Sequence, residues 1–129
     1  MSRKSTAAPS TGDDPVNLAV LRGECSGPAE VRVLESGTRL ASLAVRVPAG
    51  ETATSVPVTV WDPSTAVESL SEGDPVTVVG RVRRRFYRQG GATGSRVDVE
   101  AERIVTGSDK RRRAAARRFA ESALAHLDA

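Results

Sequence analysis

Hydrophobic and polar residues alternate along most of the chain, and this period of two predicts β-strands. The alternation is clearest in residues 55–61, where Val56, Val58 and Val60 share one face and Thr59 and Trp61 share the other. Similar patterns occupy residues 16–23, 29–36, 38–47, 75–87 and 96–105. The first two of these are interpreted as one strand broken near residues 23–28, so five strands are expected. Residues 48–55 and 89–95 are interpreted as loops.

A single short helix is expected between the third and fourth strands, within residues 62–74. Asp62 suits the N-cap, Pro63 the first helical position and Gly73 the end of the helix. Five strands with one helix at this place predict an all-β fold, the five-stranded Greek-key OB-fold barrel. A second, C-terminal helix is expected from Ser108 or Asp109 to about Leu127.

The domain organisation follows from these segments. Residues 1–15 are predicted to form a disordered leader, residues 16–107 the OB-fold domain and residues 108–129 a basic amphipathic helical tail. No apolar run approaches the roughly 18 residues that span a bilayer, and the N-terminus has no apolar stretch typical of a secretory signal. With only Cys25 as a thiol, no internal disulfide is expected, which favours a cytoplasmic location, close to the nucleoid.

Positive charge is unevenly placed along the chain. Residues 16–107 hold equal numbers of arginines and acidic residues, and the formal excess of +3 lies in residues 108–129. Five arginines nevertheless gather between residues 81 and 88, beside Phe86 and Tyr87. A local basic stripe on a neutral body indicates a site for a polyanion.

The alternation assigns this stripe to one face of the fourth strand. Val76, Val78 and Val82 are predicted to face the core, and on the last strand Val97, Val99 and Ala101 likewise. Outward rings would stack on bases while guanidiniums meet phosphates, which is how proteins hold single-stranded nucleic acid. The predicted nucleic-acid-binding residues are Thr59, Trp61, Arg81, Arg83, Arg85, Tyr87 and Arg88.

Plainer interpretations compete with each of these assignments. Trp61 could cap the mouth of the barrel, Phe86 is expected to pack, and an arginine run is often only a soluble face. Asp98, Glu100 and Glu102 are expected to be the solvated face of an edge strand, paired with the arginines, rather than a metal cluster. Nothing in the sequence favours an enzyme, a metal or a cofactor.

Over residues 16–107 the chain resembles the bacterial single-stranded DNA-binding proteins. The collinear matches are VNLAVLRGECSGPAEVRVLESGTRLASLAVRV, VPVTVWDPSTAVESLSEGDPVTVVGRVRRRFY and RVDVEAERI. The resemblance implies an OB-fold that binds single-stranded DNA, with RNA as an alternative ligand, in replication, recombination or repair, and that assembles as a homotetramer or homodimer. It also implies that Trp61 and Tyr87 stand at stacking positions and that Arg81, Arg83 and Arg85 lie on the DNA face.

The sequence departs from that family in two places. Ser55 stands where the family usually carries an aromatic residue, and residues 48–55 hold none, which predicts a smaller footprint on DNA. Instead of a long acidic tail with a hydrophobic tip, the chain has SDKRRRAAARRFAESALAHLDA, so recruitment of partners by such a tip is not expected. These departures indicate a divergent paralogue.

The basic helical tail has two interpretations of its own. An apolar stripe includes Ala116, Phe119 and Leu127, so the helix could simply pack on the body. Its cations lie at the end of the helix where the dipole disfavours them, which suggests phosphate contacts or docking on a partner. The candidate tail contacts are Lys110, Arg111, Arg112, Arg113 and Arg117. The alternative function is therefore an OB-fold interaction or regulatory module that acts through this helix, with weak or no nucleic-acid binding.

Overall fold

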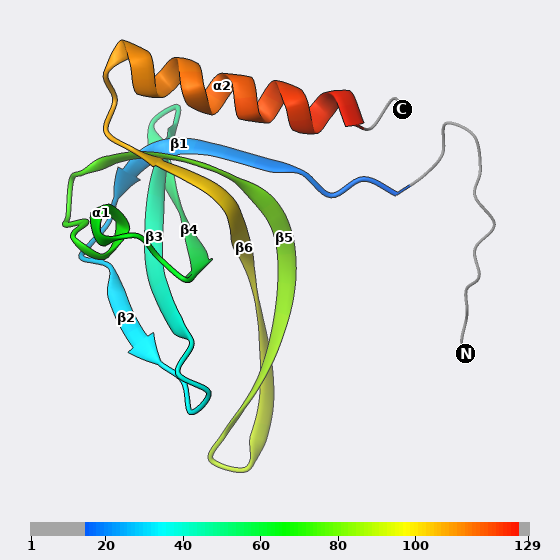
Figure 1. The fold of residues 1–129 in the computed structure, drawn as a ribbon. Helices are drawn as coiled ribbons and strands as arrows, with labels where there is room; N and C mark the ends of the chain where they lie inside the picture. The colour runs from blue at the N-terminus through cyan, green and yellow to red at the C-terminus, as the bar shows by residue number, and fades with distance from the viewer. Residues whose placement is uncertain (1–14, 127–129) are drawn as a thin grey trace.

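The strands form one sheet that closes on itself in a computed structural model, which describes residues 15–126 (Figure 1). The sheet order is β1-β5-β6-β4-β3-β2, and an additional β1–β3 pairing completes the closure. The elements are β1 (Ala19–Cys25), β2 (Glu30–Val33), β3 (Arg39–Ala49), β4 (Thr52–Trp61), α1 (Thr65–Glu68), β5 (Pro75–Gln89), β6 (Ala92–Thr106) and α2 (Lys110–Ala125). The predicted leader, apart from residue 15, lies outside the described residues.

The broken first strand is confirmed, because β1 and β2 both pair with β3. Helix α1 follows β4, which confirms one short helix between the third and fourth strands of the five-strand count. Its N-cap is Ser64, whose side chain accepts a hydrogen bond from the backbone N–H of Val67, so the expected cap at Asp62 is wrong. Asp62 instead has a φ of 55° and turns the chain out of β4.

A small core of aliphatic residues fills the closed sheet. Its most buried members include Val45, Val58, Val76, Val78 and Val99. The close approach of two strands depends on Gly80, where an added Cβ would lie 2.0 Å from the carbonyl oxygen of Glu100. The alternation therefore predicts the inward face of β5 correctly, although Thr77 and Val79 on its other face are buried as well.

Beginning at Val82 and Val99, where β6 stops pairing with β4, strands β5 and β6 continue as a two-stranded ribbon that projects from the body (Figure 1). Val82 and Val97 lie on this ribbon with 45% and 46% of their surface exposed, so their predicted place in the core is wrong. Phe86 is exposed as well, against the expectation that it packs. Alternation predicts the face of a strand, but the core ends where the closed sheet ends.

The two expected loops are instead tight hairpin turns. Strand β3 extends to Ala49 and β4 begins at Thr52, and strands β5 and β6 meet at Gly90 and Gly91. Both of these glycines have positive φ values, 59° and 84°, as a two-residue turn that follows strand twist requires. Residues expected in loops therefore extend the paired strands.

Helix α2 packs against β5 and β6, at the end of the molecule away from the β5–β6 turn (Figure 1). Asp109 is the N-cap, and its carboxylate accepts from the N–H of Arg112 at 2.9 Å. Ala116 is buried, and the guanidinium of Arg103 lies 5.7 Å from the centre of the Phe119 ring. The expected C-terminal helix is confirmed over the described residues, although Leu127 lies outside them. No helix within residues 15–126 is long and apolar enough to cross a membrane.

Candidate nucleic-acid interface

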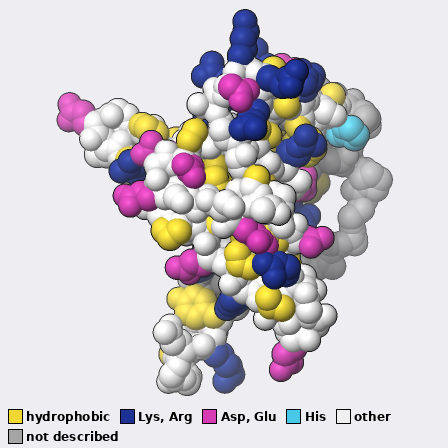
Figure 2. Space-filling model, turned by 60° about the vertical axis from the view of Figure 1, so that its left-hand side comes forward, with side chains coloured by type: hydrophobic (Ala, Val, Ile, Leu, Met, Phe, Trp, Pro, Cys, Tyr) yellow, Lys and Arg dark blue, Asp and Glu magenta, His cyan; other side chains and the backbone are white. Residues whose placement is uncertain are grey.

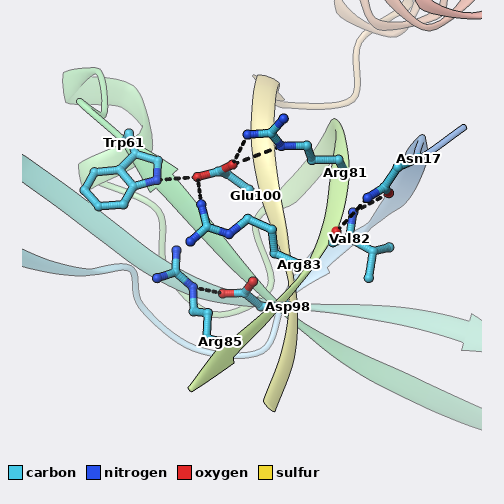
Figure 3. Close-up of polar contacts among 8 residues, drawn as sticks. All are labelled: Asn17, Trp61, Arg81, Val82, Arg83, Arg85, Asp98 and Glu100. Carbon is cyan, nitrogen blue, oxygen red and sulfur yellow. Dashed lines mark hydrogen bonds and ion pairs between the residues drawn. The ribbon is translucent and has the colours of Figure 1, made fainter. Parts of the chain in front are cut away.

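Three arginines of β5 lie on one face of the ribbon and each contacts a carboxylate of β6 (Figure 3). Arg81 donates from Nε and Nη2 to Oε1 of Glu100, at 3.1 and 2.9 Å. Arg83 donates from Nη1 to Oε2 of Glu100 at 2.5 Å. Arg85 donates from Nε to Oδ2 of Asp98 at 2.7 Å. The predicted common face of the arginines is therefore present, and two acidic residues hold it in place.

Trp61 reaches the same cluster from the end of β4. Its indole Nε1 donates to Oε2 of Glu100 at 2.7 Å, and the guanidinium carbon of Arg85 lies 6.0 Å from the centre of its ring. The side chain remains partly exposed. Trp61 thus stands beside the arginines on the outer surface of the sheet, with its orientation fixed by Glu100.

The two carboxylates are buried, in contrast to the expected solvated edge. Only 1% of Asp98 and 8% of Glu100 is exposed, because β6 lies between β5 and β4 rather than at an edge. Their expected pairing with the arginines is present in the described chain. The negative charges of this face therefore lie beneath its positive ones.

The electrostatics of Glu100 follow from its neighbours. Burial by itself raises the pKa of this carboxyl group, but hydrogen bonds from Arg81 and Trp61 and the charges of Arg83 and Arg81 outweigh burial and lower the pKa overall. Glu100 is consequently ionised at neutral pH and serves as the common acceptor for three side chains.

Asp98 links β4 to the ribbon in a similar way. The hydroxyl of Thr59 donates to its Oδ2 at 2.8 Å, and the same oxygen accepts from Arg85. Within the described residues, Oδ1 of Asp98 and Nη2 of Arg85 are buried without a hydrogen-bond partner. The pair thus uses one of the two bonds that an arginine and a carboxylate can make. Thr59 accordingly positions Asp98 rather than facing solvent.

A groove of about 580 Å³ runs between the ribbon and strands β2 to β4. The Tyr87 ring lies directly over Gly94, where an added Cβ would be 2.6 Å from the ring. The residues that line the groove include Arg32, Ser42, Thr59, Arg85, Phe86, Tyr87, Arg96 and Asp98. The groove therefore brings together three of the predicted binding residues, Thr59, Arg85 and Tyr87.

Sequence reasoning missed Arg32 and Arg96 of this groove. Arg96 lies directly opposite Arg85 in the β5–β6 register. A two-residue turn at Gly90 and Gly91 fixes this pairing, so recognising the turn in the sequence would have identified Arg96. Arg88, by contrast, is exposed near the turn and does not line the groove. The basic residues of α2 lie at the opposite end of the molecule.

Other candidate chemistry is sparse in the described part of the chain. Residues 15–126 contain no group of three or more His, Cys, Asp or Glu side chains that could hold a metal ion. Cys25 is fully buried, and burial together with the charge of Asp74 raises the pKa of its thiol. The Cys25 thiol is thus a core side chain held in its neutral form.

Comparison with known proteins bears on the fold. No protein-family model matches the chain, and no curated protein matches it either. Among solved structures, the crystal structure of the single-stranded DNA binding protein from Thermus aquaticus superposes with a TM-score of 0.61 at 22% sequence identity, over 73% of this chain and 41% of that one. A deletion variant of the same protein gives a TM-score of 0.62 at 22% identity, over 74% and 42%. The chain spans about two fifths of the length of these neighbours, and the likeness shows that its sheet has the same OB-fold as theirs.

Proposed function

We propose that this protein binds single-stranded DNA with little sequence preference, through Trp61, the arginines of β5 and the groove bordered by Tyr87. The observation that carries the proposal is the common surface of an indole ring and three guanidiniums on β4 and β5. Stacking on aromatic rings contributes about 1–3 kcal/mol per base and tolerates any base. The Thermus aquaticus protein that shares the fold is named for binding single-stranded DNA, which supports the same ligand here.

The buried carboxylates modulate how the arginines meet phosphates. Arg81 and Arg83 each keep N–H groups that are not used by Glu100, and exposure of the side chains falls from Arg81 to Arg85. Phosphates would therefore contact the outer guanidinium edges while Asp98 and Glu100 hold the inner edges. We expect weaker phosphate contacts than the number of arginines suggests, and a correspondingly shallow dependence on salt.

The experiment that tests this proposal is a titration of labelled oligothymidine with the full chain, followed by fluorescence anisotropy. We expect saturable binding that the combined change Trp61→Ala and Tyr87→Ala weakens by about 2–6 kcal/mol if each ring stacks on one base. Arg39→Gln is the control, because Arg39 pairs with Glu68 outside this surface. Absence of binding, or equal binding by the double variant, would contradict the proposal. Competition with the matched RNA decides between the two nucleic acids.

We further propose that the protein works as a homo-oligomer in DNA replication, recombination or repair, close to the nucleoid. The ribbon supports assembly because Val82 and Val97 leave apolar surface exposed on the face opposite Arg81, Arg83 and Arg85. A second copy covering Val82 and Val97 would leave these three guanidiniums open to DNA. A solution mass measurement of the protein and of Val82→Ser tests this: a dimer or tetramer that Val82→Ser dissociates is expected, and a monomer would contradict it.

A further inference from the structure

The first half of α2 carries a dense basic surface that neither the fold nor the groove uses. Its members are Lys110, Arg111, Arg112, Arg113, Arg117 and Arg118, and all are exposed. Within residues 15–126, the only ion pair among them joins Arg112 to Asp109, at 3.5 Å. The cations also lie toward the helix N-terminus, where the helix dipole opposes positive charge. Residues 110–113 therefore disfavour the start of the helix, and most of this charge has no ion-pair partner among the described residues, which indicates that it binds an anion.

The opposite side of α2 fixes this basic surface in place. Ala116 is buried against the body, Phe119 lies beneath Arg103, and Asp109 caps the first turn. Lys and Arg side chains gather at the same end of the molecule in the space-filling view (Figure 2). Helix α2 is thus fixed to the body with its cations exposed, and this basic surface is called the platform below.

Charge-paired arginines lie between this platform and the groove. Glu100 pairs with both Arg81 and Arg83, so this stretch carries less excess positive charge than the platform. Phe119 borders a hollow with Gly80, whereas Tyr87 borders the groove, and seven strand residues span roughly 23 Å. The cations of the platform are therefore set apart from the ring-bearing groove, which suits a second nucleic-acid segment better than a continuation of the stacked strand.

We propose that the basic surface of α2 binds the phosphate backbone of a nucleic-acid duplex, so that the protein sits at a junction between single-stranded and duplex DNA. The chemistry differs from that of the groove because Phe86 and Tyr87 lie near the β5–β6 turn, away from α2, and Phe119 is covered by Arg103. A surface without an exposed ring among its described residues offers no stacking and needs no unpaired bases. Guanidiniums pair with phosphates in bidentate fashion, and a duplex presents a phosphate charge every ~1.7 Å of its axis.

The test compares three labelled DNAs with the full chain: oligothymidine, a blunt duplex, and the same duplex with an oligothymidine overhang. The proposal rests on single-strand binding by the groove, so oligothymidine reports that function separately. The variant is Arg113→Gln with Arg117→Gln, which removes two exposed charges one helical turn apart and retains good helix formers. The matched control is Arg39→Gln with Arg46→Gln, which removes two charges paired elsewhere on the surface.

We expect the junction to bind about tenfold more tightly than oligothymidine at low salt, and the helix variant to lose most of that gain while binding oligothymidine as before. The control variant should keep the gain. Equal affinity for junction and oligothymidine, or equal loss on both DNAs in the helix variant, would overturn the proposal. Competition by polyglutamate as strong as by duplex of equal charge would also overturn it, because the surface would then suit an acidic protein. If oligothymidine itself did not bind, the result would instead contradict the proposed single-strand binding by the groove.

Discussion

The indole Nε1 of Trp61 and the carboxylate of Glu100 are joined by a hydrogen bond of 2.7 Å between β4 and β6. The same oxygen, Oε2, also accepts a hydrogen bond from Arg83, while Oε1 accepts two hydrogen bonds from Arg81. One buried acid thus sets the position of an aromatic ring and two cations that come from different strands. The proposed DNA surface is therefore preorganised by an anion, although its ligand is itself anionic.

Two substitutions of Trp61 distinguish the contribution of its aromatic ring to DNA binding from that of its hydrogen bond to Glu100. Trp61→Phe keeps an aromatic face but loses the donor to Glu100, whereas Trp61→Ala loses both. We expect Trp61→Ala to weaken oligothymidine binding by about 1–3 kcal/mol and Trp61→Phe to weaken it less, as measured by anisotropy of labelled DNA. Equal affinities of all three proteins would remove this ring from the interface.

Removing the charge of Glu100 should strengthen the response to salt. Glu100→Gln keeps an oxygen that can accept from Trp61 but no longer neutralises Arg81 and Arg83. We expect the slope of log affinity against log salt to steepen by about one unit, since an additional phosphate contact becomes available. The measurement is an oligothymidine titration at several salt concentrations. An unchanged slope would mean that these arginines do not meet phosphates.

The same carboxylate links stability to pH. The pKa of Glu100 is lowered in the folded protein, so its contribution is present above the ordinary pKa of a glutamate and is lost as pH falls through the lowered value. We expect the free energy of unfolding to decline over this acidic range, and to decline less in Glu100→Gln. At neutral pH the substitution should cost about 1–2 kcal/mol, because two partly exposed arginines lose their counter-charge. Urea unfolding at neutral and acidic pH measures both effects, and parallel pH profiles for the two proteins would contradict the assignment.

Gly80 is expected to be essential for the departure of the ribbon from the body. A Cβ at this position would lie 2.0 Å from the backbone oxygen of Glu100, so Gly80→Ala must move one strand. We expect a loss of about 1–3 kcal/mol in unfolding free energy. Gly27→Ala is the matched control, because an added Cβ there meets no atom within 4 Å. Equal melting temperatures for the two variants would show that the close approach is not required.

The alternation of residues predicts the closed sheet, its valine core and the shared face of Arg81, Arg83 and Arg85. It fails at Val82 and Val97, because the period of two reports which way a side chain points and not where the covering core ends. The pairing of Glu100 with Arg81 depends on register, which is set by the turn at Gly90 and Gly91. A loop over residues 89–95 leaves the β5–β6 register unspecified. The sequence therefore does not predict that Asp98 and Glu100 are buried partners of the arginines.

The intrinsic fluorescence of Trp61, the single tryptophan of the chain, tests most directly whether single-stranded DNA stacks on this ring. Emission is recorded while unlabelled oligothymidine is added, with the anisotropy of a labelled oligomer measured in parallel. We expect Trp61 emission to be quenched as the DNA binds and both signals to reverse together with added salt. Binding in the anisotropy channel with no change in Trp61 emission would contradict stacking on Trp61, because the strand would then lie elsewhere on the protein.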